Sequence, residues 1–152
     1  MDENLICYCG LYCGNCAVKA RVHPAAVKLR DEMEKAGFGD VINAIPGGGD
    51  FWKFLSGMVS EGICVSCQKG SGNPGCAVRK CAQEKGMKMC ALCESYPCDL
   101  FQKYFKGFAG VFRDNDVIRE KGMKAWSKMQ DDRRKKGYTY ADEDRGDVSE
   151  RM

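Results

Sequence analysis

The sequence predicts a mainly α-helical protein, a small helical domain with an irregular cysteine-rich segment in its middle. Apolar residues recur at helical spacing on both sides of residues 64–98, whereas that segment has few apolar residues other than cysteine and little strand-like alternation. A chain of 152 residues could bury roughly 70% of its unfolded surface, which is enough for one domain. We expect a single domain over 1–140, with cysteine-rich parts at 7–16 and 64–98, and a polar tail at 141–152.

The first half of the chain predicts two longer helices. Pro24 suits the first turn of the first helix, whose apolar positions recur at helical spacing until Gly37. The Pro and Gly residues at 46–49 form a breaker, and Asp50 is expected to be the N-cap of the second helix. An amphipathic stripe of aromatic and aliphatic residues at 51–59 follows, which we interpret as core rather than as a binding surface.

Three further helices are expected in the second half. A short helix over 77–85 is stopped by Gly86. An amphipathic helix over 100–108 carries a second aromatic stripe, which we also interpret as core. The longest helix is predicted over 114–136, where basic residues near its end complement the helix dipole.

The cysteine content favours metal over disulfides. The chain has 11 cysteines, about 7% of its residues, which is close to the share found in disulfide scaffolds and metal proteins. Their number is odd, and the acidic N-terminus does not have the basic and apolar regions of a secretory signal. We therefore expect a cytoplasmic protein, in which thiols stay reduced. No stretch approaches the roughly 18 apolar residues of a membrane helix, so no membrane association is expected.

The spacing of the cysteines indicates zinc. A C-x-x-C turn places two thiolates on one ion, and zinc takes four ligands in a tetrahedron. Such turns are predicted at Cys13/Cys16, Cys64/Cys67 and Cys90/Cys93, and seven of the cysteines lie within the 35 residues of 64–98. Because this segment does not have the residues of a conventional core, metal would have to order it and clip it to the helical body.

Zinc would also change how the charge of the chain is interpreted. The formal net charge is +3. Each four-thiolate zinc site carries a charge of about −2, so two sites would bring the total to about −1. A nucleic-acid partner is therefore not supported, whereas a protein partner stays possible.

Three cysteine motifs resemble those of a known family. They are CGLYCGNC from Cys9 to Cys16, CAVRKCAQEKG from Cys76 to Gly86, and CALCESYPC from Cys90 to Cys98. In order, spacing and companion residues, about residues 9–108 resemble the microbial cysteine-rich domain of unknown function numbered 3795. The resemblance implies a small cytoplasmic protein presumed to bind metal, without an assigned activity.

Ten cysteines fit this pattern and are the predicted metal ligands: Cys9, Cys13, Cys16, Cys64, Cys67, Cys76, Cys81, Cys90, Cys93 and Cys98. Cys7 lies outside the pattern and is interpreted as a bystander. Eight thiolates would complete two zinc sites. One arrangement divides them by position: Cys64, Cys67, Cys76 and Cys81 on one ion, and Cys90, Cys93 and Cys98 with Cys13 or Cys16 on the other. In a cross-braced arrangement, Cys64/Cys67 faces Cys90/Cys93.

Redox chemistry is the alternative to structural zinc. Thiolate-rich sites also suit iron–sulfur clusters, and the spacing of Cys9, Cys13 and Cys16 is that of radical S-adenosylmethionine enzymes. The strand–helix alternation of those enzymes is missing, as is the βαβ context of a thiol–disulfide oxidoreductase. The one histidine, His23, is interpreted as a helix-entry residue. The sequence reveals no reaction, so we predict a zinc-binding interaction module whose metal is mainly structural, because closed four-thiolate sites favour binding over catalysis.

Overall fold

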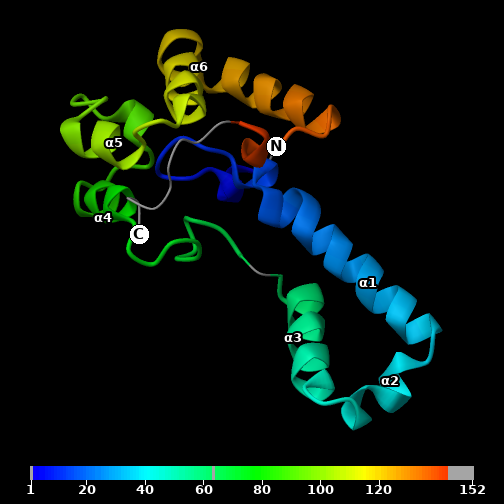
Figure 1. Ribbon diagram of the computed structural model, residues 1–152. Coiled ribbons are helices and arrows are strands. Elements are labelled where there is room, and N and C mark those ends of the chain that lie inside the picture. The colour runs from blue at the N-terminus through cyan, green and yellow to red at the C-terminus, as the bar shows by residue number, and fades with distance from the viewer. Residues whose placement is uncertain (1, 63, 144–152) are drawn as a thin grey trace. The chain divides into compact units, whose positions relative to one another are not determined.

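The computed structural model describes residues 2–62 and 64–143, and it is mainly α-helical in these residues (Figure 1). The α-helices are α1 (His23–Lys35), α2 (Phe38–Val41), α3 (Gly48–Ser60), α4 (Ala77–Glu84), α5 (Asp99–Tyr104) and α6 (Ala109–Lys135). Short 3-10 and π turns join them: η1 (Glu3–Leu5), η2 (Cys13–Asn15), η3 (Val18–Val22), η4 (Ile42–Ala44), η5 (Cys90–Leu92) and η6 (Tyr140–Asp142). Within the described ranges, β-type pairing is limited to an isolated bridge between Ile6 and Tyr12. The predicted fold class is confirmed.

The chain divides into two compact units. One consists of Met1–Cys16 together with Ser66–Met152, and the other of Ala17–Val65. We call them the cysteine unit and the 17–65 unit. The single domain over 1–140 stays a prediction. Of the tail predicted at 141–152, residues 144–152 lie outside the described part of the chain.

The 17–65 unit is built on the packing of α1 against α3. As predicted, α1 has Pro24 in its first turn and ends just before Gly37. The predicted cap of the next helix is wrong, because α3 begins at Gly48. Gly47 adopts the left-handed conformation (φ 74°), and the N–H of Gly48 donates to the carbonyl of Ile45 at 2.8 Å. This turn starts the helix early and leaves Asp50 inside the first turn, where its negative charge suits the helix dipole.

The stripe at 51–59 is core only in part. Leu55 is buried, but Phe51 and Phe54 are 43% and 68% exposed. The interpretation of this stripe as core is therefore wrong for both phenylalanines. Within its unit α3 packs on α1 and η4, and neighbours on one side of a helix cover only one of its faces.

The cysteine unit has an aromatic core. The stripe at 100–108 is core at its phenylalanines, since Phe101, Phe105 and Phe108 are all buried and their tilted rings contact one another in sequence. The interpretation is wrong for Leu100, which is 36% exposed. The helix itself is shorter than predicted, because α5 ends at Tyr104. Five cysteines pack against this core: Cys9, Cys76, Cys90, Cys93 and Cys98. The thiols therefore lie beside an apolar interior.

Helix α6 extends the helix predicted over 114–136 at its start and contains an unpredicted break. Gly122 has φ 79° and ψ 169°, a conformation outside the helical region. Figure 1 shows the two halves of α6 pointing in different directions. The second half places Trp126, which is fully buried, edge-on against the ring of Tyr12, with ring centroids 6.1 Å apart. The second half of α6 thus contacts the N-terminal segment of the cysteine unit.

Candidate metal centre

Two of the C-x-x-C pairs fold into the same turn. In η2 the N–H of Cys16 donates to the carbonyl of Cys13 at 3.0 Å, and in η5 the N–H of Cys93 donates to that of Cys90 at 2.9 Å. The closing residues have nearly identical backbone angles, φ −74° and ψ 132° at Cys16 and φ −76° and ψ 133° at Cys93. The third pair, Cys64/Cys67, is divided between the two units. The repeated turn is a local fold that suits paired thiolate ligands.

Four cysteines line one small cavity in the cysteine unit, and we call this group the inner thiols: Cys81, Cys90, Cys93 and Cys98. They come from α4, from η5 and its C-cap, and from the N-cap of α5. The cavity has a volume of about 30 Å³, and its lining also includes Tyr96 and Phe101. Because a single water or small ion needs roughly 10–15 Å³, the space suits one ion and little else.

Among the inner thiols, Cys90 has surroundings that oppose its ionisation. Burial, followed by the thiols of Cys9, Cys98, Cys81 and Cys93, raises the pKa of Cys90 to about 12. A buried thiol surrounded by thiols keeps its proton unless a cation offsets the negative charge. A divalent ion reverses this balance, since a coordinated thiol is deprotonated outright.

A second group of cysteines surrounds Cys7. The sulfur of Cys7 lies 3.2 Å from that of Cys13. Hydrogen bonds with Cys13, Cys67 and Cys9, and then burial, raise the pKa of Cys7 well above its ordinary value. The bond with Cys7, the backbone N–H of Tyr8 and the guanidinium of Arg79 lower the pKa of Cys67 to about 6, against the opposing effect of burial. Cys7, which was interpreted from the sequence as a bystander, therefore lies in contact with Cys13, and we call Cys7, Cys9, Cys13 and Cys67 the outer thiols.

The remaining predicted ligands have other surroundings. The sulfur of Cys76 caps α4, accepting the N–H of Arg79 at 3.4 Å, and it interacts with the hydroxyl of Tyr104. Cys16 closes the η2 turn, and Cys64 belongs to the 17–65 unit. The cavity groups Cys81 with the cysteines of 90–98, which differs from the arrangement that puts Cys81 on one ion with Cys64, Cys67 and Cys76. The cross-braced arrangement stays a prediction. Across the described ranges, no three His, Cys, Asp or Glu side chains already have the spacing of a coordination sphere.

A glycine and an asparagine hold the CGLYCGNC motif in place. Gly10 approaches the side chain of Asn115 so closely that a Cβ at this position would lie 2.4 Å from its Oδ1. The Nδ2 of Asn115 donates to the carbonyl of Cys9 at 2.8 Å and to that of Val111 at 2.7 Å. The first half of α6 therefore fixes the backbone at Cys9, and only glycine fits beside that contact.

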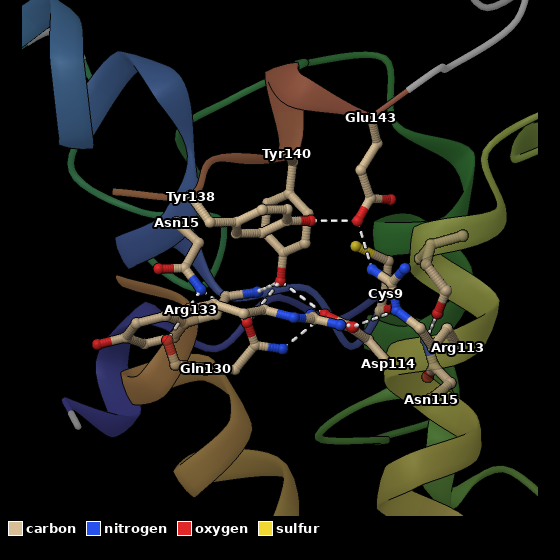
Figure 2. Close-up of polar contacts among 12 residues, drawn as sticks. Cys9, Asn15, Arg113, Asp114, Asn115, Gln130, Arg133, Tyr138, Tyr140 and Glu143 are labelled. Carbon is tan, nitrogen blue, oxygen red and sulfur yellow. Dashed lines mark hydrogen bonds and ion pairs between the residues drawn. The ribbon is translucent and has the colours of Figure 1, made fainter. Parts of the chain in front are cut away.

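A buried polar network anchors the same motif to both halves of α6 (Figure 2). Asn15 donates to the side chain of Gln130 at 2.7 Å, and Gln130 donates to Asp114 at 2.6 Å. The carboxylate of Asp114 also accepts from Arg133 and from the hydroxyl of Tyr140, each at 2.7 Å. The sequence carried no signal for this network, because its members in α6 have the spacing of an ordinary polar helix face. Its chemistry is structural, since its donors and acceptors are directed at one another.

Within the described residues, the helices are all too short or too polar to span a bilayer. The model of a family described as "Protein of unknown function (DUF3795)" matches residues 5–103, about two thirds of the chain. The match includes both groups of thiols and ends before α6. No curated protein and no solved structure matches the chain. The resemblance of the cysteine motifs is thereby confirmed, and the chain belongs to the DUF3795 family of proteins of unknown function.

Proposed function

We propose that the chain is a zinc-binding protein in which the inner thiols hold one ion, and that this metal is mainly structural. One observation carries the proposal, namely that Cys81, Cys90, Cys93 and Cys98 line a single cavity with room for one ion. Four thiolates are the complete ligand set of a tetrahedral structural zinc site, which keeps no open position for catalysis. The ion would join α4, η5 and α5 beside the apolar core that Val78 and Phe101 already share.

The size of the cavity favours zinc over the iron–sulfur alternative. A cavity of about 30 Å³ suits one ion. An iron–sulfur cluster adds several irons and sulfides to the same four ligands and needs more room. Soft thiolates select zinc or iron over the harder divalent cations, and a single zinc ion fits both the ligands and the space.

The metal content of two matched variants tests this proposal. Cys98→Ser removes an inner thiol, so we expect anaerobically purified protein to lose one zinc ion per chain relative to the wild type. Cys76→Ser is the control, because serine is a good N-cap and α4 should keep its start and the protein its zinc. A brown protein with iron and labile sulfide, or a Cys98→Ser variant with unchanged zinc, would contradict the proposal.

We also propose that the protein is cytoplasmic and that it binds another protein. The exposed apolar residues of the 17–65 unit support this interaction role. Most of the exposed large apolar side chains of the described residues lie in this unit: Val22, Leu29, Phe38, Val41, Ile45, Phe51, Phe54 and Val65. Residues 17–65 contain as many acidic as basic residues, so the unit does not have the positive charge that nucleic acid requires. An apolar, uncharged protein face is the partner that fits such a surface.

A fluorescent apolar probe tests whether this surface is available. We expect the folded protein to bind anilinonaphthalene sulfonate, and Phe54→Asp to reduce the signal more than the control Leu92→Asp, since Leu92 is exposed in the cysteine unit. Sedimentation of both variants identifies a second copy as the partner if Phe54→Asp alone dissociates a dimer. Equal signals from both variants would remove the support for the interaction role.

A further inference from the structure

We propose that Cys7 and Cys13 form a reversible disulfide, which makes this pair a redox modification site, with a small-molecule disulfide of the glutathione type as its oxidant. The site goes beyond the proposed function, because neither cysteine belongs to the inner thiols. Cys7 then has a role although the family pattern leaves it out. Three observations support the site: the contact between the two sulfurs, the backbone that fixes this contact, and the unequal burial of the two thiols.

The two sulfurs are already in contact. The Sγ atoms of Cys7 and Cys13, both free thiols, lie 3.2 Å apart. Sulfurs in a disulfide are about 2.05 Å apart, so the pair has to close by roughly 1.1 Å. Rotation about the side-chain bonds can cover such a distance. Two sulfurs in contact are all that a disulfide needs, whereas a structural zinc site needs four ligands.

A tight hairpin produces this contact. Ile6 and Tyr12 form an antiparallel bridge, and Cys7 and Cys13 are the next residues along the chain. The N–H of Cys7 donates to the carbonyl of Leu11 at 2.8 Å, which continues the pairing beyond the bridge. The backbone of the hairpin therefore places the two cysteines beside each other without help from any bound group.

The core of the cysteine unit holds the second arm of the hairpin in place. Tyr12 is buried, its N–H donates to the hydroxyl of Tyr140 at 3.1 Å, and its ring lies edge-on against Trp126. On the other side of Cys13, the N–H of Cys16 closes the η2 turn onto the carbonyl of Cys13 at 3.0 Å. A thiol held in this way meets its partner at a high effective concentration, which favours bond formation within the pair.

Unequal burial sets the order of the two exchange steps. Cys7 is half-buried, whereas Cys13 is 8% exposed. The thiolate of Cys7 attacks one sulfur of glutathione disulfide, which forms a mixed disulfide and releases one glutathione. The thiolate of Cys13 then attacks the sulfur of Cys7, which forms the protein disulfide and releases the second glutathione. The pair loses two electrons and two protons, and glutathione disulfide gains them as two thiols.

A peptide map of the full wild-type chain tests the pairing. Anaerobically purified protein is equilibrated with mixtures of oxidised and reduced glutathione, alkylated, and digested with chymotrypsin without reduction. Cleavage after Tyr8 and Tyr12 separates Cys7 from Cys13 but leaves Cys13 and Cys16 in one peptide. We expect the Cys7–Cys13 disulfide to exceed the Cys13–Cys16 disulfide by about tenfold or more, and dithiothreitol to reverse it. In urea this preference should disappear, because the hairpin sets it.

Three serine variants test the order of the steps. Cys13→Ser removes the second thiol, so Cys7 should keep glutathione as a stable mixed disulfide. Cys7→Ser leaves only the buried thiol, and Cys13 should acquire glutathione roughly ten times more slowly. Cys16→Ser is the matched control, because Cys16 belongs to the same motif and it should leave the Cys7–Cys13 disulfide unchanged.

The outcomes separate this site from the proposed function. A wild type that joins Cys13 to Cys16, or Cys7 to Cys9 or Cys67, overturns the proposed pair, as does a folded chain that stays reduced in glutathione disulfide alone. Native mass spectrometry of the oxidised protein should still find the zinc ion of the inner thiols. Zinc released in step with the Cys7–Cys13 disulfide would make the pair metal ligands and overturn the redox site. A chain that forms the disulfide but binds no zinc contradicts the proposed function alone.

Discussion

At the scale of single residues, the cysteine unit depends on a carboxylate that is completely buried. Asp114 is 0% exposed, and a buried charge is costly unless it is paired and hydrogen-bonded. Arg133 pairs with its Oδ1, while Gln130 and Tyr140 both donate to its Oδ2. Both oxygens are therefore satisfied. Because Gln130 also accepts from Asn15, the bonds of Asp114 extend to the motif that carries Cys13 and Cys16.

Asp114→Ala should destabilise the protein severely. Removing one member of a buried pair leaves the other uncompensated, and we expect a loss of about 3–5 kcal/mol in the free energy of unfolding, measured by urea denaturation. Arg113→Ala is the control from the adjacent position. The Arg113 side chain is 47% exposed where it pairs with Glu143, so its loss should cost no more than about 1 kcal/mol. Equal effects would show that the network contributes little.

The lowered pKa of Glu143 predicts how the free energy of unfolding changes with pH in the acidic range. Burial raises the pKa of Glu143, but hydrogen bonds from Tyr138 and Arg113 outweigh it and leave the pKa below its ordinary value. The unfolded chain therefore binds the proton more tightly, so the stabilisation is present above about pH 4.3 and is lost as the pH falls through the folded pKa. Glu143→Gln should flatten this part of the curve in urea unfolding at stepped pH. A curve as steep as that of the wild type would contradict the assignment.

At the scale of elements, local signals decide how well a helix can be predicted. α1 and α4 lie close to their predicted ranges because Pro24 and Gly86 act within a few residues. The predicted start of α3 is wrong, because Gly47 in the left-handed conformation, rather than the side chain of Asp50, sets the first turn. The break in α6 could not be predicted, because helical spacing of apolar residues continues on both sides of Gly122. After the break, Trp126 packs against Tyr12 of the distant N-terminal segment.

Two glycine variants test this account of α6. Gly122 has a backbone conformation that residues with a Cβ avoid, so Gly122→Ala should cost about 1–3 kcal/mol. Gly57 lies inside α3, and a Cβ there would meet nothing within 4 Å. Gly57→Ala should therefore stabilise the protein, by about 0.4–1 kcal/mol. Thermal unfolding of both variants shows whether each change in stability is a gain or a loss. A stabilising Gly122→Ala would mean that α6 is straight in solution.

At the scale of the whole molecule, the grouping of the thiols is what the sequence could not supply. The set of cysteines followed from spacing and family resemblance, but the partners depend on how α4, η5 and the N-terminal hairpin pack. Cys81 joins the cysteines of 90–98 because Cys98 starts α5, and α4 packs against α5. The sequence carried no signal for the contact of Cys7 with Cys13, because that contact depends on the bridge between Ile6 and Tyr12 and not on a recognisable motif.

Zinc removal should therefore affect the chain unevenly. The inner thiols join α4, η5 and α5, so chelation of zinc-loaded protein should speed amide hydrogen exchange across residues 77–104. The 17–65 unit has its own packing between α1 and α3 and contains no residue of either thiol group, so its exchange should stay unchanged. Hydrogen-exchange mass spectrometry resolves the two regions in one experiment, with the Cys98→Ser protein as the reference for the chelated state. Uniform loss of protection would mean that the metal holds the whole chain together as one cooperative unit, and unchanged exchange at 77–104 would mean that the inner thiols hold no structural ion.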